Sequence, residues 1–502
     1  MPARVLMVVG TTSSAGKSLL VTALCRIFAR QGVRVAPFKG QNMSNNAAVC
    51  PDGSEIGRAQ AVQAMAAGLE PTAEMNPVLL KPEGDTRSQA VVMGRAWRTV
   101  SARAYYKDGE NPLWKVVTSS LDHLREAYDL VVIEGAGSPA EMNLKDRDIV
   151  NMAVARYAQA PVLLVGDIDR GGVFAQLLGT LWLLEPEERA LIKGLVVNKF
   201  RGDPTLFVDG IRILEERGGV PVLGMVPYLH DLGIPAEDAV TIEEQSFQKP
   251  AAGEIDIAVI HLPRISNFDD FDALASEPGV HVRYVTSLEA LGTPHAVIVP
   301  GTKSTIADLA WMRERGLADA VVHLAEQGTA VVGICGGYQM LGRSIQDPDH
   351  VESPLDAVPG LALLPTETTF RGVKATHRVQ ATVTANHGWL AALQGQTVQG
   401  YEIHMGRTAS ESAWLEITER SGQPVAVPDG AMSTEGKRWG CYLHGLFENT
   451  ALRHAWLETL GWQIGAGYTA AASRHEAGFE RLADAVEAAL DMEKLKALVW
   501  GA

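Results

Sequence analysis

Apolar stretches of strand length recur along the first half of the chain, and segments with helical periodicity separate them. These stretches lie at 4–10, 33–38, 129–135, 161–168, 194–199 and 221–227. Alternating β and α patterns, with strands that are apolar throughout, are typical of a parallel sheet that is covered by helices on both faces. The pattern therefore predicts a doubly wound α/β domain.

A second series of apolar stretches begins after a break in this pattern. Residues 233–254 combine proline, glycine and acidic residues without a buried period, as linkers do. Further strand-like stretches lie at 255–262, 281–285, 295–301 and 329–335, and later in VQGYEIH and RWGCYLHG. We therefore expect a second doubly wound α/β domain over 255–502 after a first over 1–232, with the last forty residues mostly helical.

Composition limits the location and the partners of the protein. The 502 residues carry a formal net charge of −15 at pH 7, which disfavours binding to nucleic acid or to an anionic membrane. The four cysteines are widely spaced and form no C-x-x-C pair, so neither a disulfide framework nor a zinc site is indicated. No apolar run approaches the length of a membrane span. We therefore expect a cytoplasmic protein with no nucleic-acid or membrane partner.

The first strand-like stretch ends in a loop of small residues, GTTSSAGKS at 10–18, and a helical pattern follows it. Such a loop lets backbone N–H groups converge on phosphate oxygens, while the helix N-terminus adds partial positive charge. The loop is one residue longer than the G-x-x-x-x-G-K-[ST] motif and resembles the dethiobiotin synthetase type of phosphate loop. We predict that ATP binds to Gly10, Thr11, Thr12, Ser14, Ala15, Gly16, Lys17 and Ser18.

Two residues at strand ends extend this predicted phosphate site. Lys39 ends the second strand-like stretch, where another cation can face the phosphates, and Glu134 ends a later one. The hard oxygens of Glu134 and Ser18 can bind Mg²⁺. The alternatives are that Lys39 is a surface lysine and that Glu134 caps the following turn.

Cys335 follows an apolar strand directly in VVGICGGYQML and precedes two glycines and a helical pattern. This is the layout of a nucleophile elbow, in which the reactive side chain lies on a sharp turn. Gly336 and Gly337 relieve crowding there, and the following helix N-terminus favours both a thiolate and a developing oxyanion. The alternative is a buried structural cysteine.

A cysteine nucleophile needs a base, and His444 ends a late apolar strand in WGCYLHGLFEN. Together the two residues could hydrolyse the side-chain amide of glutamine through a thioester and release ammonia. Among the other histidines, His404 in GYEIHMG is the strongest rival for the role of base.

At this point the motifs match a known family. The chain resembles cobyric acid synthases, the CobQ/CbiP type of glutamine-dependent amidotransferase, in segments that follow one order from residue 10 to residue 448. The segments are GTTSSAGKS, KGQNMSNN, KPEGDTRSQAVVMG, EGAGSPAEMNLKDRDIVNM, DIDRGGVFAQLLGT, NKFRGD, LPRISNFDDFDAL, PGTKST, GICGGYQMLG, GYEIHMG and YLHGLFEN.

The resemblance implies a dethiobiotin-synthetase-like P-loop domain followed by a class I type glutamine amidotransferase domain. It implies ATP- and Mg²⁺-dependent amidation of the b, d, e and g carboxylates of adenosylcobyrinic acid a,c-diamide, with glutamine as the nitrogen donor. ATP would convert each carboxylate into an acyl phosphate that ammonia can attack. We therefore expect a covered site at the interface of the two domains, which keeps water from the acyl phosphate. The sequence leaves open whether the protein forms a homo-oligomer.

The resemblance also implies roles for further residues. Gly301 in PGTKST would join Gly336 and Gly337 in the glutamine pocket and its oxyanion site. Asp146 would assist phosphoryl transfer or deprotonate the attacking amine. The alternative is that Asp146 is a solvated surface charge. Contacts to the corrinoid substrate are expected from Asn42, Asn45, Asn46, Lys81, Arg87 and Ser88.

One position departs from the pattern of class I glutamine amidotransferases. These enzymes carry a glutamate two residues after the catalytic histidine, whereas here the next glutamate is Glu448, four residues after His444. We therefore expect a Cys335–His444 dyad without a close third residue.

Two alternative functions stay open at this point. A cobyrinic acid a,c-diamide synthase would share both the phosphate loop and the cysteine elbow, although KGQNMSNN and LPRISNFDDF favour the first interpretation. A P-loop nucleotide switch that works by changing partners would share the loop, but it would need neither Cys335 nor His444.

Overall fold

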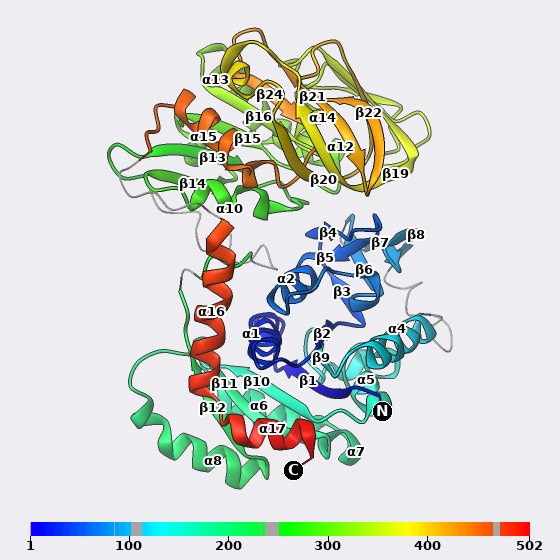
Figure 1. The fold of residues 1–502 in the computed structure, drawn as a ribbon, viewed down its shortest axis with the longest axis vertical. Coiled ribbons are helices and arrows are strands. Elements are labelled where there is room, and N and C mark those ends of the chain that lie inside the picture. Colours follow the sequence, from blue (N-terminus) through cyan, green and yellow to red (C-terminus); the bar gives the residue numbers. More distant parts are fainter. Residues whose placement is uncertain are drawn as a thin grey trace.

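The computed structural model of this chain describes residues 2–84, 86–101, 113–230, 232–235, 250–464 and 472–501. They form two lobes, and Figure 1 shows each lobe built around its own sheet. Most of the linker predicted at 233–254 lies outside the described residues.

The first lobe contains a six-stranded parallel sheet with helices on both faces. Its strands are β1 (Arg4–Gly10), β2 (Val35–Phe38), β9 (Leu130–Glu134), β10 (Val162–Asp167), β11 (Ile192–Phe200) and β12 (Val222–Pro227). Its helices include α1 (Lys17–Arg30), α2 (Arg58–Ala66), α4 (Trp114–Ala127), α5 (Met152–Ala158), α6 (Val173–Leu183), α7 (Pro186–Arg189) and α8 (Val208–Gly218). The strand order is β12–β11–β10–β1–β9–β2, which confirms the predicted doubly wound arrangement.

Short strands between β2 and α4 extend this lobe toward the second one (Figure 1). A four-stranded sheet and a two-stranded hairpin lie here. Their strands are β3 (Gln41–Met43), β4 (Ala47–Val49), β5 (Glu55–Gly57), β6 (Val78–Pro82), β7 (Arg87–Val92) and β8 (Arg95–Ser101). The strand-like patterns of the sequence did not predict this extension.

The second lobe contains another six-stranded sheet, in which all neighbouring strands are parallel except one edge pair. Its strands are β13 (Ile255–Ile260), β14 (Val280–Val285), β15 (Ala296–Val299), β16 (Ala330–Ile334), β23 (Ala431–Met432) and β24 (Arg438–Cys441), in the order β14–β13–β15–β16–β24–β23. Its helices include α10 (Asp272–Ala275), α11 (Leu288–Leu291), α12 (Thr305–Glu314), α13 (Leu317–Glu326), α14 (Gly336–Leu341) and α15 (Thr450–Thr459).

A second sheet, in which all pairings but one are antiparallel, also belongs to the second lobe. Its strands are β17 (Ser344–Gln346), β18 (Ala357–Pro359), β19 (Thr366–Val383), β20 (Thr397–Ser410), β21 (Leu415–Arg420) and β22 (Gln423–Asp429). The stretch VQGYEIH lies in β20, which pairs antiparallel with β19. Its expected place in the parallel sheet is therefore wrong, because only some residues of β20 are buried, which suits a sheet with one face on the core.

Strands in both central sheets are buried on both faces, which explains their apolar sequences. Residues 5–10 of β1 and all of β16 are buried, for example. Burial of each such Val or Leu side chain contributes about 1.5–3 kcal/mol to folding. These buried strands therefore hold the polar residues at their carboxyl ends in fixed positions.

The C-terminal helices α16 (Ala472–Ala489) and α17 (Met492–Trp500) pack on the first lobe, and Figure 1 shows α16 running beside α1. Leu482 and Val486 belong to the same buried cluster as Phe28 of α1. Arg30 pairs with Glu480 at 2.9 Å and with Asp484 at 2.6 Å. This packing differs from the expected boundary, which assigned everything after residue 255 to the second domain. Within the described part of the chain, no helix has the length and apolar character needed to cross a membrane.

Candidate active sites

The phosphate loop lies between β1 and α1, and its shape depends on Gly16. This residue has a φ of 93°, and a Cβ atom there would lie 2.1 Å from Asn198 Nδ2. Asn198, near the end of β11, donates a 2.8 Å hydrogen bond from Nδ2 to the Ala15 carbonyl. A side chain at residue 16 would therefore clash with the group that supports the loop. Asn198 is not among the residues predicted for this site, although its NKFRGD segment was recognised.

Lys17 and Thr11 make further contacts around the loop. The buried Lys17 Nζ donates to the carbonyl oxygens of Thr12 at 2.8 Å and of Ser13 and Gly137 at 3.1 Å. Thr11 Oγ1 donates to Gln176 Oε1 at 3.0 Å. The ammonium group thus lies against the loop and against the segment that follows β9.

The carboxylate of Glu134 is the centre of a buried polar cluster beside the loop. Ser18 Oγ donates to Glu134 Oε1 at 2.8 Å, and Lys39 Nζ contacts the same oxygen at 2.9 Å. Gln63 Nε2 donates to Glu134 Oε2 at 2.5 Å, and Gln60 lies 3.4 Å from that oxygen. The structure therefore brings three residues predicted for this site together and adds two glutamines of α2. In the sequence, the only indication of these glutamines was that their polar side chains lie on a short, Ala-rich helix.

The oxygens in this cluster suit a hard divalent cation. Glu134 and Ser18 supply two of them, and Gln63 Oε1 is buried and has no hydrogen-bond partner among the described residues. Mg²⁺ prefers oxygen ligands and is usually bound by one or two carboxylates together with substrate phosphates. Among the described residues, no group of three or more His, Cys, Asp and Glu residues could hold a metal ion. The cluster therefore fits Mg²⁺ that is shared with a nucleotide.

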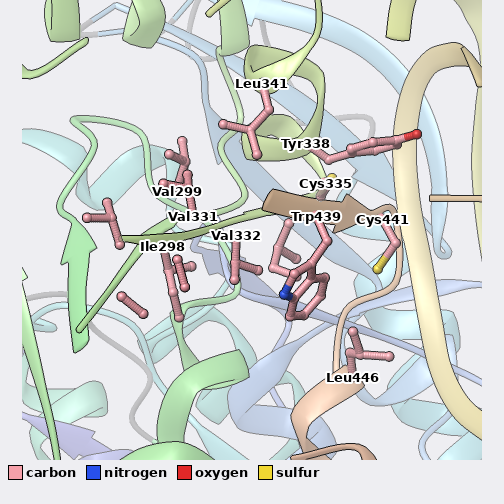
Figure 2. Packing of buried hydrophobic residues seen from close by; sticks show 14 of the residues in the cluster. Ile298, Val299, Val331, Val332, Cys335, Tyr338, Leu341, Trp439, Cys441 and Leu446 are labelled. Carbon is pink, nitrogen blue, oxygen red and sulfur yellow. The ribbon is translucent and has the colours of Figure 1, made fainter. Parts of the chain in front are cut away.

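Cys335 lies between β16 and α14 in strained backbone. Its φ is 50° and its ψ is −109°, a conformation that L-residues rarely adopt. A Cβ atom at Gly337 would lie 1.8 Å from the Val299 carbonyl oxygen, so only glycine fits there. Figure 2 shows Cys335 near Tyr338 and Trp439 in the apolar packing. The predicted sharp turn is present.

His444 is buried and hydrogen-bonded to an aspartate outside the predicted set of site residues. Its Nδ1 lies 2.6 Å from Asp270 Oδ2, and Asp270 Oδ1 accepts the Gly445 N–H at 2.8 Å. Asp270 belongs to the 3₁₀ helix η4 (Phe268–Phe271). The expectation of a dyad without a close third residue is therefore wrong. Glu448, the next glutamate after His444 in the sequence, is exposed.

The charge of Asp270 controls the protonation of His444. Burial acts to lower the pKa of His444, but the negative charges of the Asp270 carboxylate and a Cys335 thiolate, with their hydrogen bonds, raise it to about 10. An imidazolium is therefore the stable form of His444 at neutral pH. His404, the rival base, hydrogen-bonds to the Gly406 carbonyl at 2.8 Å and stacks on Tyr442 with a ring separation of 3.7 Å.

Both lobes contribute to one cavity of about 390 Å³ that contains Cys335 and His444. Lys81 and Arg87 of the first lobe line it. Gly301 lies against His444, because a Cβ atom there would come within 2.8 Å of His444 Cε1. Lining residues from the second lobe also include Thr302, Lys303, Gly336, Gln339, Glu352 and Lys374.

Comparison with known proteins agrees with this two-lobe arrangement. Residues 6–242 match the family described as CobQ/CobB/MinD/ParA nucleotide binding domain, and residues 256–452 match the CobB/CobQ-like glutamine amidotransferase domain. A curated cobyric acid synthase from Chloroflexus aurantiacus is 57% identical over 98% of this chain and 98% of its own. The chain belongs to the cobyric acid synthase family.

Other members of the cobyric acid synthase family show the same extent of similarity. The relative from Roseiflexus castenholzii is 54% identical over 99% of both chains. The relative from Moorella thermoacetica is 49% identical over 99% of this chain and 97% of its own. The chain is therefore an ATP-dependent glutamine amidotransferase ligase, and the nucleotide-switch alternative is set aside.

Among the family segments, KGQNMSNN lies at the junction of the lobes. Asn42 is buried, and its Nδ2 donates to Gln60 Oε1 at 3.0 Å. Asn46 Oδ1 accepts the N–H of Asn267, which belongs to the second lobe, at 2.7 Å. Asn45 Oδ1 is buried, and no residue in the described part of the chain forms a hydrogen bond with it. Contact of these asparagines with a corrinoid stays a prediction.

The remaining predicted substrate contacts on β6 and β7 lie close together but differ in exposure. Lys81 is buried and pairs with Glu55 at 2.6 Å, whereas the side chain of Arg87 is 67% exposed. Ser88 pairs with Pro82 in the β6–β7 ladder. Asp146 is exposed on the 3₁₀ helix η2 (Met142–Arg147), so its part in catalysis also stays a prediction.

Proposed function

We propose that this chain amidates the b, d, e and g carboxylates of adenosylcobyrinic acid a,c-diamide, with ATP as the activating substrate and glutamine as the nitrogen donor. The observation that carries this proposal is the pairing, within one chain, of a phosphate loop beside Glu134 with a buried Cys335–His444–Asp270 site. The first lobe, residues 1–232 with α16 and α17 packed on it, activates the acid, and the second lobe, which begins at residue 255, releases ammonia.

Activation is a phosphoryl transfer in the first lobe. A substrate carboxylate oxygen attacks the γ-phosphorus of ATP, the bond to the bridging oxygen breaks, and an acyl phosphate and ADP form. Lys17 and Lys39 offset the negative charge of the phosphates, and the loop N–H groups orient them. Ser18 and Glu134 would hold Mg²⁺, which neutralises phosphate charge when bound.

Glutamine hydrolysis takes place in the interlobe cavity. Cys335 Sγ attacks the side-chain amide carbon, and backbone N–H groups near Gly336 and Gly301 stabilise the oxyanion. His444 donates a proton to the departing nitrogen, so ammonia leaves and a thioester remains. Water then hydrolyses the thioester to glutamate. Asp270 holds the imidazolium in place.

Transfer of ammonia inside the protein completes the reaction. Ammonia in water at neutral pH is mostly ammonium, which lacks a free electron pair, so release into a covered space keeps it reactive. The cavity at Cys335 supports this, because residues of the first lobe form part of its wall. Attack of ammonia on the acyl phosphate forms the amide and releases phosphate.

Two variants test the division of labour. Cys335→Ser should lose amidation with glutamine but keep it with ammonium chloride as the nitrogen source. Lys17→Ala should lose amidation with both nitrogen sources, because it removes charge at the phosphate loop. If Cys335→Ser keeps glutamine-supported amidation, the glutaminase assignment is wrong.

The acceptor is tested by comparing two corrinoids. Cobyrinic acid and its a,c-diamide are each supplied with ATP, Mg²⁺ and glutamine, and products are separated by mass. We expect up to four additions on the diamide. A clear preference for the acid that lacks the a and c amides would instead indicate a cobyrinic acid a,c-diamide synthase.

A further inference from the structure

Helix α2 touches both candidate sites. Gln60 and Gln63 lie beside Glu134 in the nucleotide site. Arg58, the first residue of the same helix, contacts the second lobe next to His444. A nine-residue helix is a rigid element, so a displacement at one end moves the other end as well.

Arg58 forms a buried contact with two groups of the second lobe. Its Nε lies 3.0 Å from Asp269 Oδ2, and its guanidinium donates a hydrogen bond to the hydroxyl of Tyr401. The guanidinium carbon also lies 5.2 Å from the centre of the Tyr401 ring. Burial raises the pKa of Asp269, and the charge of Arg58 opposes that rise. The ion pair is therefore shielded from water and stronger than a surface pair.

Both partners of Arg58 adjoin the residues that hold His444. The Tyr401 ring stacks on the imidazole with centroids 5.2 Å apart and an interplanar angle of 18°. The backbones of Tyr401 and His444 also exchange hydrogen bonds of 3.1 and 2.9 Å. Asp269 precedes Asp270, the partner of His444 Nδ1. Arg58 is not among the described residues that line the cavity, so it acts on His444 through these neighbours.

A second interlobe contact fixes the same part of the site. Asn267 makes two hydrogen bonds to consecutive residues of the first lobe: its N–H donates to Asn46 Oδ1, and its Oδ1 accepts the Ala47 N–H at 2.9 Å. Asn267 directly precedes η4, which carries Asp270. The position of η4 is thus tied to the first lobe at two points, through Asn267 and through Asp269.

We propose that Arg58 is a positioning residue for glutamine hydrolysis, and that α2 links its position to the state of the nucleotide site at Glu134. The inference rests on the proposed function in taking Cys335 and His444 as the glutaminase centre. Binding of ATP and Mg²⁺ changes the partners of Glu134, and Gln60 and Gln63 pass this change along α2. Ammonia is then released when an acid is ready to receive it.

The test compares Arg58→Gln with Arg378→Gln. Arg378 also joins the lobes, through the Val49 carbonyl at 2.8 Å and Glu70 at 2.6 Å. Its backbone pairs with Tyr401 in the β19–β20 ladder, but none of its described side-chain hydrogen bonds or ion pairs reaches Tyr401 or Asp269. Glutamate formation is measured with and without ATP, Mg²⁺ and cobyrinic acid a,c-diamide. Arg58→Gln should lower kcat about tenfold to a hundredfold, leave KM for glutamine unchanged and abolish the response to ATP.

Several results would overturn the proposal. One is an Arg58→Gln variant with normal kcat, and another is an equal loss in Arg378→Gln, which would indicate a general role in docking the lobes. A wild-type chain that hydrolyses glutamine at the same rate with and without ATP would refute the link through α2. If Arg58→Gln does not fold, Tyr401→Phe tests the same contact and should lower kcat as well.

A conservative variant and a second substrate separate the inference from the proposed function. Arg58→Lys keeps a positive charge beside Asp269 but lacks the planar guanidinium group with its several N–H donors. Its kcat should therefore lie between those of the wild type and Arg58→Gln. Amidation supported by ammonium chloride should stay normal in Arg58→Gln, Arg58→Lys and Arg378→Gln. Failure of the wild type to amidate the corrinoid would refute the proposed acceptor, whereas glutamate formation still tests Arg58.

Discussion

The carboxylate of Asp270 lies 2.6 Å from Nδ1 of His444, although 174 positions separate the two residues in the sequence. Its other oxygen accepts the N–H of Gly445, so the carboxylate fixes both the ring and the backbone that follows it. This arrangement leaves Nε2 as the nitrogen that can exchange a proton with Cys335 or with the departing amine.

Replacement of Asp270 should change both the rate and the pH dependence of glutamine hydrolysis. Asp270→Asn removes a charge that raises the pKa of His444, so that pKa falls from its value of about 10. The imidazolium is then lost at lower pH, and the alkaline limb of the kcat profile should move toward neutral pH. We expect kcat to fall on the order of a hundredfold or more, because the ring also loses its orientation.

Glu448→Gln is the matched control for this measurement. Glu448 is the nearest carboxylate after His444 in the sequence, but it is exposed. The variant should keep both the rate and the profile of the wild type. An effect of Glu448→Gln as large as that of Asp270→Asn would contradict the role of Asp270.

Gly301 should tolerate no side chain, because it faces the ring of His444. A Cβ atom there would lie 2.8 Å from His444 Cε1, so Gly301→Ala should push the imidazole out of line with Cys335. We expect a loss of about a hundredfold in kcat for glutamine hydrolysis, with ammonia-supported amidation retained. Gly372→Ala, where a Cβ atom meets nothing within 4 Å, should be silent in the same assays.

Gly16 should be essential for nucleotide binding. Its φ is 93°, and the methyl group of an alanine there would lie 2.1 Å from Asn198 Nδ2, so Gly16→Ala must distort the loop. ATP affinity, measured by calorimetry, should fall sharply while glutamine hydrolysis without ATP continues. Gly179→Ala in α6 adds a methyl group in open space and should leave ATP affinity unchanged. Normal ATP binding by Gly16→Ala would contradict the role of Gly16 in shaping the loop.

Strand ends made much of the fold and part of the sites predictable from the sequence. Glu134 ends an apolar run, Cys335 directly follows one, and Lys17 begins the helix after the loop that follows another. The carboxyl ends of parallel strands meet along one edge of a sheet. The doubly wound class of both domains followed from the same runs, because strands that are buried on both faces have little choice of residue type.

The residues that join distant segments could not be predicted in this way. NFDDFD contains three aspartates within four positions, and only the folded chain shows that Asp270 is the one that contacts His444. Arg58 and Gln63 belong to a short helix without a recognised motif. The C-terminal helices have an amphipathic pattern that predicts a helix but does not indicate which lobe it covers.

A buried charge cluster between the lobes should make the interface sensitive to Glu55. This carboxylate lies between Lys81, at 2.6 Å, and Lys374, and all three side chains are nearly inaccessible. Burial acts to raise the pKa of Glu55, but the two lysines hold it at about 2. Glu55→Gln would remove the counter-charge of two buried lysines, which should cost about 3–5 kcal/mol in the free energy of unfolding.

The loss of stability in Glu55→Gln should be larger at neutral pH than at acidic pH. A carboxylate with a depressed pKa contributes its full stabilisation above its ordinary value of 4.5 and loses it as the pH falls toward 2. The difference in denaturant midpoint between the wild type and Glu55→Gln should therefore be largest near pH 7 and shrink below about pH 4.5. Glu70→Gln breaks the more exposed pair with Arg378 and should cost no more than about 1 kcal/mol. Equal losses in the two variants would mean that the Lys81–Glu55–Lys374 cluster contributes no more to the interface than a surface ion pair does.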